Sequence, residues 1–340
     1  CFFVCFFFFF CFVFFCVFFF VFCWLCFLCF CVTYKSLSIA QYFLSELQEK
    51  QWTGTIHSTF ARTINIIDDS GTLYTIATSE LDDAPNTIRV ADFFYDQLQI
   101  PLNTPVFVQH DQLIIEDVAA IEIDEVEKWK YPEIFFPSKK AYQELERRIQ
   151  KVDQWLGQIA SKGGYLLNHT QTTAYEKMMH TMLWKETGHL LNYLKEKQLF
   201  QAMKQLDRVI GLGPGLTPSG DDFLVGLALI FTTIDYPYHS LKQWLINCRQ
   251  ELKKRTNVIS FSTLDWAIKG EARERLGVFL NELFYGEDET LLKEKMLQVL
   301  AIGSTSGGDI LSGMLAGVEF TLEKQRETGG DSAENHNESI

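Results

Sequence analysis

A twelve-residue run near the middle of the chain, GLGPGLTPSGDD at Gly211–Asp222, constrains the fold more than any other segment. Four glycines and two prolines in twelve residues cannot continue a helix, because glycine costs backbone entropy and proline lacks an N–H donor. The run follows an amphipathic stretch and precedes the apolar segment Phe223–Phe231. We therefore predict a compact turn between two helices, with Thr217, Ser219 and Asp221 placed to cap the second one.

The same run suits a small anion. It is rich in backbone N–H groups just before a helix N-terminus, where those donors and the helix dipole favour negative charge. No Gly-Lys-Ser/Thr follows, so it is not a Walker A loop, and the glycine spacing does not fit a dinucleotide fingerprint. A plain helix–helix corner is the alternative, but the density of Gly, Ser, Thr and Asp favours a binding site. We predict that the anion contacts Gly213, Gly215, Thr217, Ser219, Gly220 and Asp222.

A second loop repeats part of the first. The sequence SGGDILSGM, from Ser306 to Met314, aligns without a gap to SGDDFLVGL, from Ser219 to Leu227. In both, a glycine follows the shared aspartate by four residues, so the two lie on one helix face and another backbone can approach the glycine closely. We predict that the two helices cross at these glycines and that both Ser-Gly-x-Asp turns face one cleft. The second turn then adds Ser304, Thr305, Ser306, Gly307 and Asp309 to the ligand site.

The two shared aspartates, Asp222 and Asp309, allow three interpretations. They cap their helices and do nothing more; or they share a Mg²⁺ ion beside a phosphate-bearing ligand, because carboxylates are hard oxygen ligands; or they orient a substrate amide or transfer a proton. If they serve one site, their carboxylates should lie within ~10 Å of each other. Asp221, between the turn and the helix, is expected to face solvent unless it caps.

No catalytic residue can be assigned from the sequence. The seven histidines form no H-x-x-x-H or H-E-x-x-H pair, so no zinc site is predicted. The serines of the glycine-rich region have no neighbouring histidine with a catalytic signature. The basic cluster Lys253–Arg255 either supplies charge to a phosphate or is a solvated helix C-terminus.

The first 32 residues contain only five residue types: 16 Phe, 8 Cys, 5 Val, 2 Leu and 1 Trp. All five have codons made only of T and G, and the chain begins with Cys, so we interpret residues 1–32 as translated repeat DNA or a wrongly extended gene start. A membrane anchor is the alternative, because the tract exceeds the ~20 apolar residues that span a bilayer. Outside it Cys248 is the only cysteine, which argues against a disulfide framework and favours a reducing, cytoplasmic compartment.

The charge of the chain argues against one class of partner. The formal net charge is -13, and no basic stripe of the kind that binds phosphate backbones is visible. We therefore predict no nucleic-acid partner, and no membrane partner unless the N-terminal tract is genuine.

The remaining chain divides into a β-rich part and a helical part. Alternating β-forming residues around the DDSG turn predict a hairpin. Further strands are expected at Thr87–Val90, Pro105–Gln109, Gln112–Glu116 and within VAAIEIDEV. Helices are expected at Ile39–Lys50 and Lys139–Ser161, capped by Ser38 and Ser138, and at Thr172–Thr187, His189–Lys197, Phe200–Ile210, Ser240–Arg255, Ser262–Glu282 and Glu289–Ala301.

These patterns together predict an α+β protein. A small β-rich, barrel-like domain over residues 38–130 is followed by a mainly α-helical domain over residues 138–324, which carries both glycine-rich loop–helix junctions. The polar tail, residues 325–340, is expected to be disordered.

The motifs resemble those of the AllH-like family of bacterial proteins. GLGPGLTPSGDD matches one family motif in full at Gly211–Asp222, and Gly303–Gly313 fits a second motif, G-[HS]-[ST]-S-G-x-D-x-L-x-G. The segments GTIHSTFARTINI and Thr256–Leu276 are also similar to the family, so the resemblance spans roughly residues 40–320. At the second motif position this chain carries Ser304, whereas relatives often carry His.

The resemblance implies a subunit of a multi-component carbamoyltransferase of purine and allantoin catabolism. Carbamoyl phosphate and oxamate would interconvert with oxalurate and phosphate, in a complex of three different subunits, one similar to acyl-CoA synthetases. The Ser-Thr-Arg-Thr phosphate loop of better-known carbamoyltransferases does not occur here. The alternatives are a non-catalytic regulatory subunit that binds a small anion in the same cleft, and an assembly scaffold whose glycine loops only pack helices.

Overall fold

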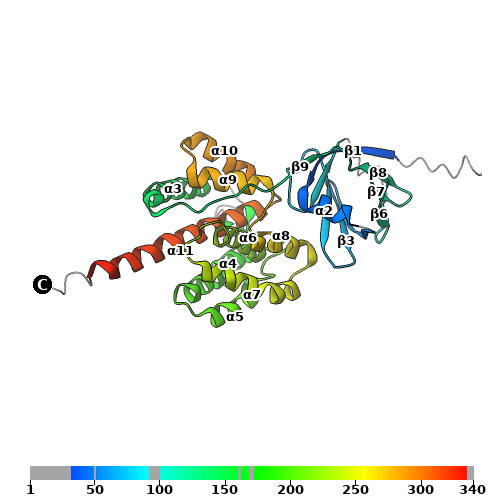
Figure 1. The fold of residues 1–340 in the computed structure, drawn as a ribbon. Coiled ribbons are helices and arrows are strands. Elements are labelled where there is room, and N and C mark those ends of the chain that lie inside the picture. Colours follow the sequence, from blue (N-terminus) through cyan, green and yellow to red (C-terminus); the bar gives the residue numbers. More distant parts are fainter. Residues whose placement is uncertain (1–31, 50, 92–99, 160–161, 168–171, 335–340) are drawn as a thin grey trace, which may run out of the picture.

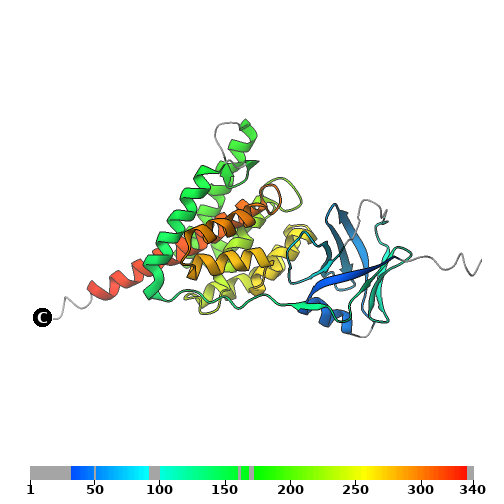
Figure 2. The same cartoon turned by 90° about the horizontal axis from the view of Figure 1, so that it is seen from above.

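A computed structural model describes residues 32–49, 51–91, 100–159, 162–167 and 172–334 of the chain (Figure 1). It confirms the predicted class: a β-barrel is followed by a mainly helical domain, and the barrel lies at one end of the molecule beside α8 and the start of α9 (Figure 1 and Figure 2). Apart from Val32, the Phe/Cys tract and both interpretations of it lie outside the described residues. Within the described part of the chain, no helix combines the length and apolar character needed to cross a bilayer.

Eight strands close into a ring in the order β5-β4-β3-β2-β6-β7-β8-β1, because β1 also pairs with β5. A ninth strand, β9, extends the sheet beside the end of β1. Closure leaves no open edge in the ring, and the alternating side chains fill its interior. The strands are β1 (Val32–Ala40), β2 (Thr53–Phe60), β3 (Thr63–Asp68), β4 (Leu73–Thr78), β5 (Thr87–Val90), β6 (Pro105–Gln109), β7 (Gln112–Ile115), β8 (Ala119–Glu122) and β9 (Glu127–Trp129).

The barrel core is built from β-branched and aromatic side chains. Ile56, Ile64 and Ile76 are fully buried inside the ring. The short helix α2 (Gln41–Gln48) covers them with Phe43, whose ring stacks on Tyr74 at 4.5 Å between centroids. Each such side chain contributes roughly 1.5–3 kcal/mol through burial, so this domain has its own hydrophobic core.

The predicted helix Ile39–Lys50 begins too early. Residues up to Ala40 belong to β1, because β1 must hydrogen-bond to β5, β8 and β9 to close the ring. Ser38 is therefore not a helix cap: its hydroxyl donates to Asp83 at 2.5 Å, and α2 has no side-chain cap. The barrel also begins at Val32 rather than at residue 38.

The helical domain follows a connecting segment and a 3-10 turn at Lys139–Ala141, which is labelled η2. A two-stranded hairpin, β10 (Lys162–Gly163) and β11 (Leu166–Leu167), lies between its first two long helices. The helices are α3 (Tyr142–Gln158), α4 (Ala174–Lys195), α5 (Leu199–Val209), α6 (Ser219–Phe231), α7 (His239–Arg255), α8 (Val258–Lys269), α9 (Glu274–Tyr285), α10 (Glu289–Leu300) and α11 (Ser306–Glu334).

Three predicted helix boundaries are wrong. Ser138 makes no side-chain cap, and the long helix starts three residues later than predicted, after the 3-10 turn. The break predicted between two helices near Gly188 is absent, and α4 is continuous there, because a single glycine costs a helix only about 1 kcal/mol. The single helix predicted over Ser262–Glu282 is divided, because Gly270 adopts a left-handed conformation (φ 88°) that ends α8.

The last helix extends into the segment predicted to be a disordered tail. It continues to Glu334, and residues 335–340 lie outside the described part. Ion pairs to other helices hold α11 in place near the start of the predicted tail. Lys195 pairs with Glu323 and Glu327, and Arg326 pairs with Glu146. These contacts give the polar segment structural partners that its composition does not reveal.

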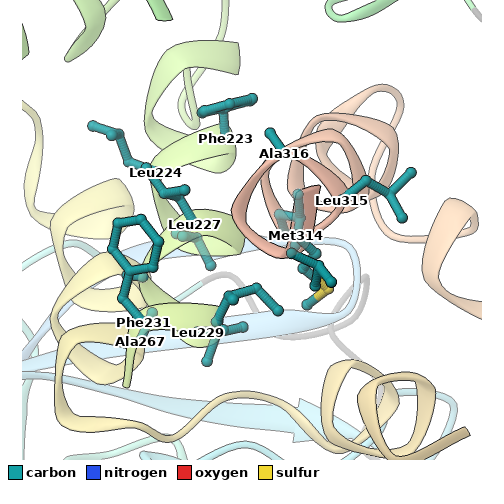
Figure 3. Close-up of a cluster of buried hydrophobic side chains, with 14 of the residues drawn as sticks. Phe223, Leu224, Leu227, Leu229, Phe231, Ala267, Met314, Leu315 and Ala316 are labelled. Atoms are coloured by element: carbon teal, nitrogen blue, oxygen red, sulfur yellow. The ribbon is translucent and has the colours of Figure 1, made fainter. Parts of the chain in front are cut away.

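Helices α6 and α11 cross at the centre of the helical domain, as the shared glycines predicted. A Cβ atom at Gly226 would lie 2.0 Å from the carbonyl oxygen of Ile310, and one at Gly313 would lie 2.0 Å from that of Phe223. Every residue of α6 is buried. Side chains of α6, α8 and α11 pack around this crossing (Figure 3).

Candidate functional site

The two Ser-Gly-x-Asp turns come together at the N-termini of α6 and α11. The hydroxyl oxygens of Thr217 and Ser306 are 3.0 Å apart across the two turns. The serine hydroxyl of each turn acts on the aspartate of the other turn and lowers the pKa of its carboxyl: Ser306 acts on Asp222, and Ser219 on Asp309. The crossing of the two helices therefore joins the turns through reciprocal polar contacts as well as through glycine packing.

Gly220 and Gly307 serve the packing of these turns. A Cβ atom at either position would lie 2.0 Å from a carbonyl oxygen of the preceding helix. Their N–H groups also donate within the chain, Gly220 to Leu212 at 2.8 Å and Gly307 to Ile302 at 3.0 Å. These two amides, which the sequence assigns to an anion, are thus engaged by the protein itself.

The other predicted loop residues have different surroundings. Gly213 (φ 116°) lies so close to the next helix that a Cβ atom would be 2.8 Å from the backbone nitrogen of Ser219. Gly215 (φ 100°) and Ser304 are exposed, and no atom lies within 4 Å of a Cβ built at Gly215. Thr305 is half-buried and hydrogen-bonds to Asp309.

Asp221 does not face solvent and does not cap α6. It is fully buried, and its carboxylate accepts hydrogen bonds from the Gly211 amide at 2.5 Å, the Ser260 hydroxyl at 2.6 Å and the Thr256 hydroxyl. The N-cap position of α6 is Pro218, which has no side-chain cap. Asp221 instead ties the glycine-rich run to α8, because a buried carboxylate needs several donors.

Asp222 and Asp309 are buried and incompletely hydrogen-bonded. Asp222 is only 3% exposed and Asp309 only 1% exposed. The Oδ2 atom of each lacks a hydrogen-bond partner among the described residues. Burial, and after it the charge of Asp309, raises the pKa of Asp222 to about 8, against the lowering effect of the Ser306 hydroxyl. Burial also raises the pKa of Asp309 to about 6, and the backbone N–H of Tyr165 opposes it.

A cavity of about 340 Å³ lies where the barrel meets the helical domain. Its barrel wall includes polar side chains of β3, β4 and β5, namely Thr63, Asn65, Thr75 and Thr87. Helix α8 contributes Ser262, Thr263 and Trp266. Thr217, Asp222 and Ser306 line its inner end, so the turns predicted from the sequence open into this cavity.

Asp309 is absent from the cavity lining because a hairpin covers it. The backbone N–H of Tyr165, between β10 and β11, donates to Asp309 Oδ1 at 2.7 Å. Gly164 (φ 68°) allows this approach, since a Cβ atom there would lie 2.1 Å from the same oxygen. In the sequence, Gly163 and Gly164 simply follow the predicted helix Lys139–Ser161, so their role at this site was missed.

Positive charge is scarce around the cavity. Among the described lining residues the charged ones are Asp82, Asp222 and Arg273. Arg273 is held by Asp82, with its Nε atom 3.0 Å from Oδ2. The basic cluster at the end of α7 is not part of this lining, and Arg255 pairs there with Asp207 at 3.0 Å. Within the described ranges no group of three or more metal-ligating side chains comes together.

These features define a two-domain α+β protein in which a ligand-sized cavity of mixed polar and apolar lining lies between a closed barrel and a helical domain. A model described as the AllH family N-terminal domain matches residues 35–128, and one described as oxamate carbamoyltransferase subunit AllH matches residues 209–318. The chain belongs to the AllH family. The first match contains the barrel wall of the cavity, and the second contains both glycine-rich turns. No solved structure matches the chain.

Proposed function

We propose that this chain is the subunit of an oxamate carbamoyltransferase that binds the amide substrate, oxamate or oxalurate, in the interdomain cavity. The observation that carries the proposal is the meeting of both glycine-rich turns at the inner end of that cavity. A volume of about 340 Å³ accommodates a molecule of this size. The family description supports the reaction, and the polar side chains among the otherwise apolar lining support a small hydrogen-bonding ligand.

The reaction joins the amide nitrogen of oxamate to the carbamoyl carbon of carbamoyl phosphate. The bond between that carbon and the phosphate oxygen breaks, its electron pair leaves with phosphate, and the nitrogen loses one proton. Developing charge on the phosphate requires cations or preorganised donors. Arg273 is the one cation among the described lining residues and is already paired, so partner subunits or Mg²⁺ would hold the phosphate.

We further propose that the complex works in the cytoplasm, in purine and allantoin catabolism, and that this chain is inactive alone. The name of the family describes a subunit, which implies that its members act with other subunits. A regulatory role in the same complex is the second candidate, because the described cavity lining offers no unpaired cation and no assigned nucleophile.

Phosphorolysis of oxalurate tests the proposal, with carbamoyl phosphate measured as the product. The chain is assayed alone, with its presumed partner subunits, and as two variants. Ala84→Phe places a large side chain in the cavity, and Gly215→Val strains the exposed loop at a positive φ. Activity should need the partners and fall sharply in Ala84→Phe.

Full activity of the reconstituted Ala84→Phe complex would overturn the cavity assignment, and full activity of Gly215→Val would remove the loop from the site. Binding of oxamate or oxalurate without activity in any complex would favour the regulatory role.

A further inference from the structure

The two turns are related by an approximate internal two-fold pairing. In each, a serine begins the helix and lowers the pKa of the aspartate of the other turn through its hydroxyl group. The glycines that follow the serines pack in the same way against the preceding helices. The two carboxylates thus have matching protein partners.

The pairing fails at one point. Asp309 receives a further hydrogen bond, from the backbone N–H of Tyr165 at 2.7 Å, and the hairpin that carries this amide covers it. Within the described part of the chain, no segment takes this place at Asp222. Its Oδ2 atom, like that of Asp309, has no partner there, but Asp222 lines the interdomain cavity although its residue is only 3% exposed.

We infer that Asp222 binds an amide N–H of the ligand, in the way that Asp309 binds the peptide N–H of Tyr165. The ligand class is a small amide or ureide, because a peptide N–H fills the matching position within the same molecule. The identity of that ligand as oxamate or oxalurate rests on the proposed function, whereas the class rests on the pairing and the cavity.

The charges around Asp222 favour this choice of ligand group. Asp309 and Asp221 lie on its helical side, and Asp82, which neutralises Arg273, lies in the cavity wall. Three carboxylates and one paired guanidinium make the position unfavourable for the negative end of a ligand. A neutral N–H donor meets no such repulsion and supplies the hydrogen bond that Oδ2 lacks.

Isothermal titration calorimetry with the full chain at about pH 9 tests the inference, because Asp222 is then an acceptor-only carboxylate. The probes are oxamate and two analogues without an N–H: oxalate, which replaces the amide nitrogen by oxygen, and N,N-dimethyloxamate, which keeps the charge of oxamate. The wild type should bind oxamate roughly tenfold or more tightly than either analogue. In Asp222→Asn the preference over oxalate should shrink to within about threefold, because the Asn amide can donate to oxalate.

Asp309→Asn is the matched control, since it makes the same substitution at the paired position. It should lower the melting temperature by loosening the hairpin and leave the preference for oxamate unchanged. Equal binding of oxamate and both analogues by the wild type, or a preference that survives in Asp222→Asn, would overturn the inference. So would a loss of preference in Asp309→Asn alone.

The proposed function can fail separately. If oxamate and oxalurate do not bind, the same comparison is made with oxamide, urea and malonamate. Binding of one of these amides, weakened roughly tenfold in Asp222→Asn, would support the inference and count against an oxamate carbamoyltransferase. Absence of binding by every amide at millimolar concentration would overturn the inference, while the activity assay with partner subunits would still judge the function.

Discussion

The turn before α6 and the turn before α11 have nearly the same residues but different surroundings. Both place an aspartate at the start of a buried helix, and both receive a serine hydroxyl from the opposite turn. Asp309 is covered by a hairpin, whereas Asp222 lines a cavity. The comparison teaches that the motif alone does not assign a role: the neighbouring segment decides whether the carboxylate holds the fold together or remains available to a ligand.

We expect the largest effect on stability from a substitution that disrupts the crossing of α6 and α11, because this crossing holds both turns in place. Gly313→Ala puts a methyl group 2.0 Å from the carbonyl oxygen of Phe223, where backbone must move, so we expect a loss of about 3 kcal/mol or more in unfolding free energy. Urea denaturation measures it. Gly188→Ala in α4 is the control, because no atom lies within 4 Å of its added methyl group. It should stabilise the chain by about 0.5–1 kcal/mol. Equal effects would contradict the packing argument.

A smaller effect is expected from a substitution that loosens the hairpin covering Asp309. Gly164→Ala is strained at φ 68° and places a methyl group against the Asp309 carboxylate. We expect a loss of about 2 kcal/mol in unfolding free energy and faster hydrogen exchange at the Tyr165 amide. Oxamate binding at Asp222 should stay within about twofold of wild type, since the cavity lies on the other side of the pair. An unchanged exchange rate at Tyr165 would show that its bond to Asp309 does not hold the hairpin.

The pKa values predict a pH-dependent difference between the two turns. The pKa of Asp222 is raised to about 8 in the folded protein, so the native state holds this proton more tightly than the unfolded chain. The stabilisation is complete in acid and is lost as the pH rises toward 8. Asp222→Asn has no proton to lose, so its melting temperature relative to wild type should rise between about pH 5 and pH 8. Between about pH 6.5 and pH 8 alone, we expect a gain of roughly 2–6 °C, equivalent to about 1–2 kcal/mol.

Asp309→Asn sharpens this comparison. The pKa of Asp309 in the wild type is raised only to about 6. The rise in melting temperature of this variant relative to wild type should therefore be complete near pH 6. Differential scanning calorimetry across this range measures both. Parallel melting curves for the Asp222 variant and the wild type at every pH would contradict the raised pKa.

The smallest expected effect tests the reciprocal hydroxyls. Hydrogen bonds from Ser306 and Ser219 lower the pKa of Asp222 and of Asp309, so Ser306→Ala should raise the first and Ser219→Ala the second. Carbon-13 NMR of labelled aspartate carboxyls measures both shifts, each expected to be about half a unit to one unit. A shift in the aspartate of the same turn, with none in the opposite one, would contradict the exchange of partners.

Local sequence patterns predicted the parts of the fold that depend on neighbours in the chain. The strands Thr87–Val90 and Pro105–Gln109 match residue for residue, and the glycine spacing foretold the crossing of α6 and α11. Local patterns could not predict β1, which is a strand because it closes the ring. Local patterns also could not predict the difference between the two turns. The Tyr165 amide that covers Asp309 lies 144 residues away in the sequence, and the cavity beside Asp222 is completed by the barrel.

The hairpin Lys162–Leu167 covers only one of the two paired turns. Its six residues of backbone lie beside Asp309, whereas Asp222 lines the interdomain cavity. Without this hairpin, two buried carboxyls of raised pKa would lie uncovered at one helix crossing. The hairpin thus makes a nearly two-fold arrangement one-sided, and the uncovered carboxyl is the one that lines the cavity shared with the barrel.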